Sequence, residues 1–176
     1  MSQIRPAGLA DAEVLAALVS AYLAERHPDH RGTTADELRR DVLGQPGGQR
    51  VLLAENDGAT IAFVAWDAIY DLHWAAKGAL IADLYVAPAH RGHGVALALV
   101  AGVCARAAAE GAVFLRGASY DRGSATGRFY ERFAVGHDSA ECNCGGRAFR
   151  HLAGLHGTSV RQMIRSLPPV EWNHEA

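Results

Sequence analysis

The sequence has few cysteines, almost no net charge and no long apolar run, and each shortage argues against a class of protein. Cys104, Cys142 and Cys144 are the three cysteines in 176 residues. Their odd number and irregular spacing argue against a disulfide scaffold and for a reducing compartment. A net charge of −2 lacks the basic excess of a nucleic-acid-binding protein. No apolar run approaches the roughly 18 residues of a membrane span, and the first residues contain no signal-peptide core. We therefore expect a cytoplasmic protein that has neither nucleic acid nor a membrane as its partner.

Familiar signatures of metal and nucleotide sites are also missing. Cys142-Asn143-Cys144 is C-x-C rather than the C-x-x-C of zinc and redox sites, so we expect no metal. The glycines at positions 92 and 94 are not followed by the Gly-Lys-Ser/Thr of a nucleotide-hydrolase phosphate loop. Leu97 stands where the dinucleotide fingerprint has its third glycine.

The most informative stretch runs from residue 79 to residue 99. Leu80–Val86 is an apolar run typical of a buried strand, and Pro88 ends it. A turn of small residues, Arg91–Ala96, then leads into apolar positions at helical spacing: Leu97, Leu99, Val100 and Val103. Free backbone N–H groups and the positive end of a helix dipole make such a turn an anion site. A bland alternative remains open at this point, in which the two glycines only ease a strand-to-helix turn.

The flanking sequence predicts a mixed α/β fold. We expect strands over 3–5, 50–55, 60–70 and 112–118, and helices over 11–25, 34–43, 95–110 and 124–133. Asn56-Asp57-Gly58 predicts a hairpin, and Thr34 with Glu37 predicts a capping box. A last strand is expected over 139–144 and a helical turn over 147–153. Antiparallel strands followed by a strand–helix–strand unit predict a mixed sheet flanked by helices, in one domain of ordinary size.

Two motifs in this order resemble the GNAT superfamily of acyl-CoA-dependent N-acetyltransferases. Its hallmark is Arg/Gln-x-x-Gly-x-Gly/Ala at the start of a helix, which Arg91, Gly94 and Ala96 match. Asp83–Val86 with Pro88 resembles the strand before it, and Phe129-Tyr130-Glu131-Arg132 resembles the second motif of the family. The resemblance runs loosely over residues 4–153. It implies an N-acetyltransferase domain over 1–153, with 154–176 as a C-terminal extension.

The resemblance implies a twisted mixed sheet in which two central parallel strands splay apart and admit acetyl-CoA, the acyl donor. It assigns the pyrophosphate to the turn Arg91, Gly92, His93, Gly94, Val95 and Ala96. The backbone of Tyr85, Val86 and Ala87 is expected to pair with the pantetheine arm. A backbone N–H near Val86 is the simplest donor to the oxyanion that forms during acyl transfer.

Two residues are candidates for proton transfer. Tyr130 fits the proton donor by its place in the second motif, since a phenol with a pKa of about 10 is protonated at neutral pH; the alternative is a packed tyrosine. Asp83 is the candidate base on the central strand. It is equally open to a structural role, because the alternation of the strand decides which face it uses.

The acceptor side departs from the family pattern. The loop at Tyr70-Asp71 and Trp74 loosely resembles the diamine-acetylating branch, but Ala82 replaces the glutamate of that branch. Gly123 stands where the second motif usually has an asparagine. We expect the acceptor pocket between two loops, with Glu25 and Asp71 holding an ammonium and Trp74 covering an alkyl chain or stacking on a cation.

The predicted function is acetyl transfer from acetyl-CoA to a primary amine of a small molecule. Two alternatives stay open: an enzyme that acetylates a protein amine, and an inactive acyl-CoA-binding sensor. An exposed apolar tail is costly, so the extension is expected to pack, either against a second copy in a homodimer, which we favour, or against its own domain. Its apolar residues are Val160, Met163, Ile164, Leu167 and Trp172.

Overall fold

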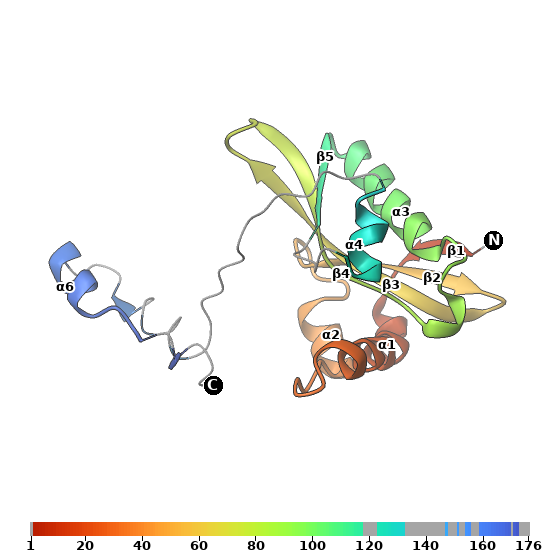
Figure 1. Cartoon of the computed structure of the whole chain (residues 1–176), viewed down its shortest axis with the longest axis horizontal. Coiled ribbons are helices and arrows are strands. Elements are labelled where there is room, and N and C mark those ends of the chain that lie inside the picture. The colour runs from red at the N-terminus through yellow and green to blue at the C-terminus, as the bar shows by residue number, and fades with distance from the viewer. Residues whose placement is uncertain are drawn as a thin grey trace. The chain divides into compact units, whose positions relative to one another are not determined.

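The structure is a computed structural model that describes residues 2–117, 123–132, 147, 151, 154–155, 159–169 and 171–172 (Figure 1). The chain divides into two compact units, residues 1–118 and 119–176, which are described separately below. In the described part of the chain, no helix has the length and apolar character needed to cross a membrane.

The first unit is built on a five-stranded sheet whose strands lie in chain order. They are β1 (Gln3–Pro6), β2 (Arg50–Asn56), β3 (Ala59–Asp71), β4 (Ala76–Val86) and β5 (Phe114–Gly117). The first four strands pair antiparallel, and β4 pairs parallel with β5. The crossover between these parallel strands contains helix α3 (Val95–Ala109), as a parallel connection requires. The predicted mixed α/β class is confirmed.

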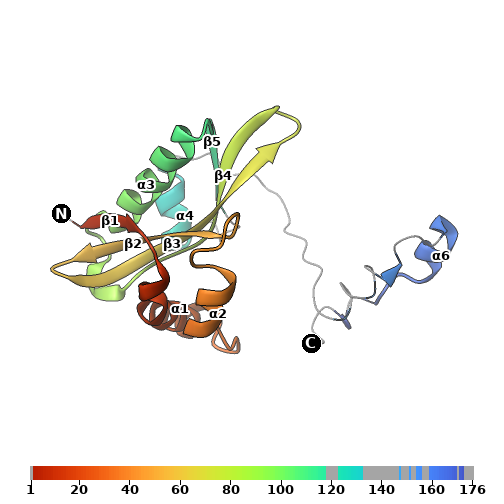
Figure 2. The ribbon, with the colours of Figure 1, turned by 180° about the vertical axis from the view of Figure 1, so that it is seen from behind.

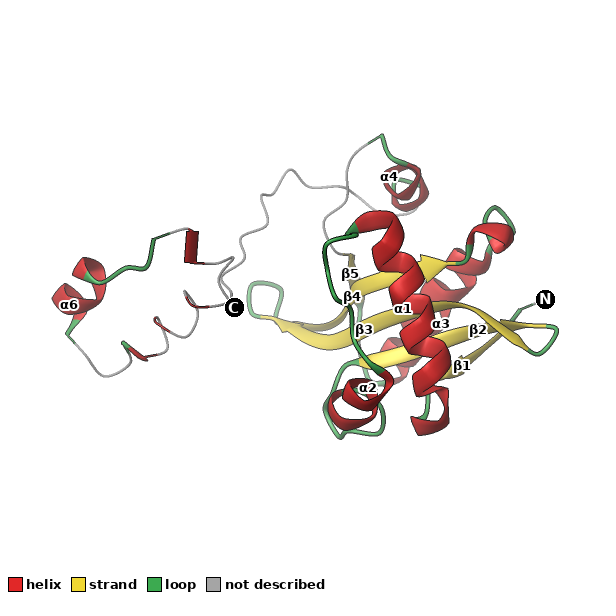
Figure 3. Ribbon diagram, turned by 90° about the horizontal axis from the view of Figure 1, so that it is seen from below, coloured by secondary structure: helices red, strands yellow, loops and turns green. Residues whose placement is uncertain are grey.

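Helices cover both faces of the sheet. A 3₁₀ turn, η1 (Leu9–Asp11), leads into α1 (Ala12–Arg26), which lies with α2 (Ala35–Asp41) on one face, while α3 lies on the other (Figures 2 and 3). Alternation along the strands sends side chains to both layers. Leu53 and Phe63 pack with Leu15 of α1, whereas Leu52 lies against α3 at Gly102. The sequence therefore buries nearly continuous apolar runs in β2 and β3, because both faces are covered.

Local signals in the sequence set the turns as predicted. Asp57 and Gly58 both adopt positive φ, at 50° and 80°, which the tight β2–β3 hairpin requires. Thr34 caps α2 by accepting a hydrogen bond from the Glu37 N–H at 3.2 Å, and the Glu37 carboxylate accepts one from the Thr34 N–H at 2.8 Å. The predicted hairpin and capping box are both confirmed.

A bulge in β4 changes how this strand is paired. Ala65 of β3 pairs with Asp83, but its neighbour Trp66 pairs with Ile81, so Ala82 is an extra residue on β4. The parallel pairing of β4 with β5 runs only from Gly78 to Ile81. Within the described residues, the end of β4 beyond the bulge thus has a sheet neighbour on the β3 side alone. Bulges of this kind often lie next to active sites.

The second unit contains α4 (Ala125–Tyr130) and α6 (Val160–Arg165). Ser124 caps α4 by accepting a hydrogen bond from the Gly127 N–H at 3.0 Å. Near the C-terminus, the Trp172 ring lies 5.3 Å from the His151 ring, centroid to centroid, and the Arg147 guanidinium lies 3.7 Å from the Trp172 ring centroid. The strand predicted over 139–144 lies outside the described residues.

Candidate active site

The turn between β4 and α3 has the geometry of an anion site. Gly92 and Gly94 adopt φ of 78° and 80°, which a residue with a Cβ rarely adopts. A Cβ at either position would meet no atom of the described residues within 4 Å, so this part of the chain leaves the space above the turn open. Helix α3 begins at Val95, and the first N–H groups of a helix have no partner within it. Such backbone groups are suited to binding an anion, and the assignment of the pyrophosphate to this turn stays a prediction.

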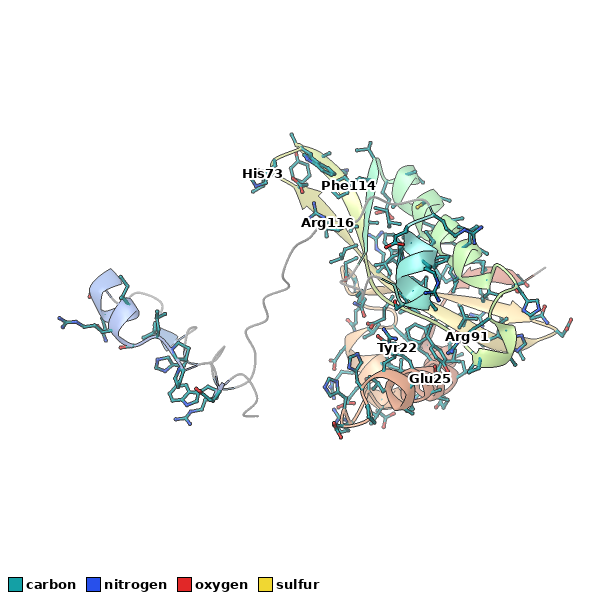
Figure 4. The ribbon with its side chains drawn as sticks, viewed as in Figure 1. Tyr22, Glu25, His73, Arg91, Phe114 and Arg116 are labelled. Carbon is teal, nitrogen blue, oxygen red and sulfur yellow. The ribbon has the colours of Figure 1, made fainter. Side chains whose placement is uncertain are left out.

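Arg91 ties this turn to the rest of the first unit. Its Nε donates to the Val86 carbonyl at 2.8 Å, and its Nη2 donates to the Glu25 carboxylate at 2.8 and 2.9 Å. The guanidinium also lies 5.4 Å from the ring centroid of Tyr85, whose hydroxyl donates to Glu25 at 2.8 Å. Figure 4 shows Glu25 and Arg91 facing each other between α1 and the turn. Arg91, followed by the Tyr85 hydroxyl, holds the pKa of Glu25 below its usual value.

The pairing of β4 decides which backbone groups it offers at its free edge. The Ala87 N–H donates to the Ile61 carbonyl of β3 at 2.9 Å. Alternate residues of an antiparallel ladder bond to the same neighbour, so Tyr85 and Asp83 also bond to β3. Leu84 and Val86 turn their N–H and carbonyl groups to the opposite edge. Of the three residues expected to meet the pantetheine arm, Val86 is therefore the one whose N–H faces the free edge, and Leu84 joins it.

A pocket of about 240 Å³ lies between α1, α2 and the sheet, within the first unit. Most of its lining is aliphatic or aromatic. Its lining residues are Leu15, Val19, Tyr22, Leu23, Thr33, Leu38, Val42, Gln49, Val51, Phe63, Ala65 and Asp83. The candidate base therefore lies on the pocket side of β4, which settles the face that alternation left open.

Asp83 and Tyr22 perturb each other in this pocket. Burial raises the pKa of the Asp83 carboxyl, and the Tyr22 hydroxyl and the charge of His27 only partly oppose that change. Burial, followed by the negative charge of Asp83, raises the pKa of Tyr22. The Tyr22 ring also lies 5.9 Å from Tyr85 and 6.1 Å from His27, centroid to centroid. A carboxylate whose pKa is raised above its usual value holds a proton more readily, which suits a group that accepts one from an amine.

The structure does not bring together the two carboxylates expected to hold one ammonium. Glu25 bonds to Tyr85, near the end of β4, whereas Asp71 pairs with Ala76, at its start. Tyr85 follows Ala76 by nine residues of strand, a distance of about 30 Å at roughly 3.3 Å per residue. Figure 4 accordingly shows Glu25 and His73 at opposite ends of the sheet. One small amine cannot contact both carboxylates.

Asp71 and Trp74 belong to the β3–β4 hairpin, where each has a local partner. The Asp71 carboxylate accepts from Arg116 at 2.6 Å and from the His73 and Trp74 N–H groups at 2.9 and 3.0 Å. Arg116, followed by the Trp74 N–H, lowers the pKa of Asp71. The Trp74 ring lies 5.0 Å from Phe114, centroid to centroid, and Trp74 remains 63% exposed.

Tyr130 lies in the second unit, at the end of α4. It is buried, and its ring centroid lies 5.0 Å from that of Phe129. Gly123, which stands in place of the usual asparagine, adopts φ of 86° one residue before the Ser124 cap. The predicted role of Tyr130 as proton donor stays a prediction.

Sequence reasoning missed Tyr22 and Leu84. Tyr22 follows Leu15, Leu18 and Val19 at helical spacing, so the pattern indicates a core position and gives no sign of a pocket. Leu84 belongs to the apolar strand, and only the register of the ladder shows that its backbone faces the free edge.

This arrangement defines an acyl-transferase class of site: an anion-binding turn, a half-paired strand and a carboxylate in an adjoining pocket. The sequence matches the Acetyltransferase (GNAT) family over residues 14–134. That match spans more than half of the chain, and the protein belongs to the GNAT family of acetyltransferases, which use acetyl-CoA as donor. A comparison with curated protein sequences finds no significant match.

Solved structures share the fold at low sequence identity. A ribosomal-protein-alanine N-acetyltransferase from Brucella melitensis biovar Abortus 2308 is 22% identical, with a TM-score of 0.68 over 81% of this chain and 97% of its own. An integron cassette protein from V. cholerae is 16% identical, with a TM-score of 0.70 over 86% and 97%. An aminoglycoside acetyltransferase from an uncultured soil metagenomic sample is 18% identical, with a TM-score of 0.66 over 81% and 97%. At these identities the likeness concerns the fold.

Proposed function

We propose that this protein is an N-acetyltransferase that transfers the acetyl group of acetyl-CoA to a primary amine of a small molecule. The position of Asp83 is the observation that carries the proposal. This carboxylate lines a pocket from the same stretch of β4 whose other edge is unpaired beyond Ile81 in the described part of the sheet. An amine in the pocket and a thioester along that edge would both lie against β4, next to each other.

The residues divide the work as follows. The backbone of Arg91–Ala96 binds the pyrophosphate, and the outward N–H and carbonyl groups of Leu84 align the pantetheine arm, because the Val86 carbonyl already accepts a hydrogen bond from Arg91. The Val86 N–H donates to the oxyanion, a contact that is stronger in the transition state than in the ground state. Asp83 accepts the proton of the attacking amine, and Tyr130 gives a proton to the departing thiolate.

The pocket supports a small acceptor over a protein segment. Most of its wall comes from side chains of α1, α2, β2 and β3, and its volume is below the roughly 300–1,000 Å³ typical of sites for drug-sized ligands. A protein amine usually needs an open groove for the residues on either side of it. Among the solved relatives, one is a ribosomal-protein-alanine acetyltransferase and another acts as an aminoglycoside acetyltransferase, so fold alone does not choose between these acceptors.

Release of free thiol from acetyl-CoA tests the proposal directly. Amine-dependent release with a panel of small amines supports it. Release that requires a peptide amine favours the protein-acetylating alternative. Tight acetyl-CoA binding without any release is the outcome expected of an inactive sensor.

The proposal includes a cytoplasmic homodimer with residues 154–176 as an extension of the catalytic domain. Ile164 and Leu167 are 65% and 63% exposed in the single chain, and exposed apolar side chains near a terminus favour pairing with a second copy. Solution scattering at micromolar concentration tests this state, since the mass of a single chain rules out the dimer.

A further inference from the structure

The pocket floor is one row of residues across three strands. Asp83 of β4 pairs with Ala65 of β3, and Ala65 pairs with Val51 of β2. All three line the pocket. Adjacent strands lie about 4.8 Å apart, so the row extends about 10 Å from the carboxylate. A charged end and an apolar end thus lie at a fixed separation.

We propose that the acceptor is a monoamine carried on a compact apolar group, an aralkyl or branched alkyl amine, and that the pocket discriminates against polyamines and aminoglycosides. This inference rests on the proposed function, because it assigns the amine to Asp83. The amine nitrogen lies at the carboxylate, and the apolar group lies over Ala65 toward Val51.

The charges of the pocket support one ammonium and no more. Asp83 is the only carboxylate among the described residues that line it, and Tyr22 at the same end supplies a hydroxyl. The row ends away from Asp83 at Val51, and Leu38, Val42 and Gln49 also line the pocket. Asp67, which does not line the pocket, already accepts a hydrogen bond from the Gln49 amide at 3.3 Å, so a second ammonium would meet mainly apolar side chains, which is unfavourable.

The volume limits the apolar group. An apolar cavity of about 150 Å³ accommodates benzene. At about 240 Å³, the pocket has room for a group of about ten heavy atoms on that scale. The small side chain of Ala65 in the middle of the floor leaves this space, because a larger residue would divide it. A branched alkyl or phenylethyl group fits these dimensions, and an aminoglycoside does not.

Two measurements on the full chain test the inference. Thiol release is measured with 2-phenylethylamine, 3-methylbutylamine, ethylamine, spermidine and sisomicin, and binding of each amine is measured by calorimetry. Differences of one methylene in an apolar pocket change kcat/KM by about 10- to 200-fold. We therefore expect 2-phenylethylamine to exceed both ethylamine and spermidine in kcat/KM by about tenfold or more.

Two variants fill the pocket from different sides. Val19→Phe adds volume from α1, and Ala65→Val adds volume from the floor. Valine is a residue that a strand accepts well. Each variant should lower kcat/KM for 2-phenylethylamine by about tenfold or more and should lower kcat/KM for ethylamine by a smaller factor, because the smaller amine needs less of the pocket. Ala17→Phe is the matched control, since residue 17 lies on the exposed face of the same helix. An equal loss of activity with both amines would indicate a damaged fold in that variant, and the other variant then decides.

The possible outcomes separate the two proposals. Preference for spermidine or sisomicin overturns the apolar-monoamine inference and leaves the acetyltransferase in place. If 2-phenylethylamine binds without thiol release, and Val19→Phe weakens that binding, the pocket assignment is upheld and the proposed function is overturned. Absence of both binding and release overturns both.

Discussion

The turn before α3 and the pocket beneath α1 both adjoin β4 but are built in opposite ways. The turn consists of six consecutive residues, and its geometry depends on backbone: two glycines at positive φ and the start of α3. The pocket is lined by twelve side chains spread from residue 15 to residue 83. The backbone conformation of the turn depends on two residues that have no side chain. The shape and charge of the pocket depend on which side chains pack together. Backbone changes should therefore damage the first, and changes of side-chain volume or charge the second.

The largest expected effect comes from the side-chain site. Asp83→Asn keeps the size of the residue and removes the proton acceptor, and general base catalysis is typically worth about 10²- to 10⁴-fold in rate. We expect kcat to fall by that factor while acetyl-CoA affinity, measured by calorimetry, stays the same, because the turn is unchanged. Equal losses in kcat and in acetyl-CoA affinity would show that the two regions are not separable.

The pH dependence of the same variant sharpens this expectation. Asp83 must be deprotonated to accept a proton, so kcat/KM rises with pH through its pKa. Burial raises that pKa above the ordinary value of 3.8, so the acidic limb of the wild-type profile should lie above pH 3.8. In Asp83→Asn this limb should disappear. If the acidic limb of the wild-type profile persists in the variant, that limb reports the titration of another group.

Backbone damage to the turn should be the next largest effect. Gly94→Val places a β-branched residue at φ of 80° and disturbs the N–H groups that we propose bind the phosphate. Hydrogen bonds to charged groups contribute about 1.5–3 kcal/mol, or about 10- to 100-fold in affinity. Calorimetry with acetyl-CoA measures the loss. Gly58→Val is the matched control: its φ is also 80° and its Cβ also meets nothing within 4 Å, but it lies in the β2–β3 hairpin.

Unchanged acetyl-CoA affinity in a folded Gly94→Val protein would reject the turn as the pyrophosphate site. A similar loss in Gly58→Val would attribute the effect to general strain, since a residue held at an unfavourable φ costs about 1–3 kcal/mol wherever it lies.

The difference between the two regions also explains what the sequence could predict. The turn was predictable because one short segment contains the strand end, both glycines and the helix start. The hairpin at Asp57-Gly58 and the capping box of Thr34 and Glu37 were predictable for the same reason, since each depends on neighbouring residues. The pocket was not predictable from the sequence. Tyr22 has the helical spacing of a core residue, and Val51 lies in an apolar run typical of a buried strand. The face of Asp83 depended on the bulge at Ala82, which no composition rule predicts. The separation of Glu25 from Asp71 required the register of β4.

A smaller effect is expected from the proton donor in the second unit. Tyr130→Phe keeps the packing of a buried ring and removes only the hydroxyl, and general acid assistance predicts a fall in kcat of at least about tenfold. Single-turnover rates measure the chemical step itself, and melting temperature serves as the control for folding. Wild-type single-turnover rates in the folded variant would leave water or the substrate as the proton source.

The smallest effects are expected from Glu25 and Asp71, the two carboxylates that the sequence analysis assigned to one pocket. Glu25→Gln removes the charged partner of Arg91 beside the turn. An exposed ion pair contributes about 0–1 kcal/mol, so KM for acetyl-CoA should rise by up to about fivefold. Asp71→Asn removes the charged partner of Arg116 at the β3–β4 hairpin, about 30 Å along β4 from that turn. It should leave KM for acetyl-CoA and for the amine within about twofold, because the residue contacts neither in the proposed site.

The hairpin result decides where the acceptor binds. If Asp71→Asn or Trp74→Ala raises KM for the amine severalfold while Val19→Phe does not, the amine contacts the exposed hairpin, as the sequence predicted, and Asp83 loses its pocket-based role. If Val19→Phe raises it and the hairpin variants do not, the acceptor lies under α1. Both results cannot hold for one small amine, because Ala65, which pairs with Asp83, is six residues of β3 from Asp71, a distance of about 20 Å at roughly 3.3 Å per residue. This pair of steady-state measurements therefore assigns the acceptor to one end of β4 without any structure of a complex.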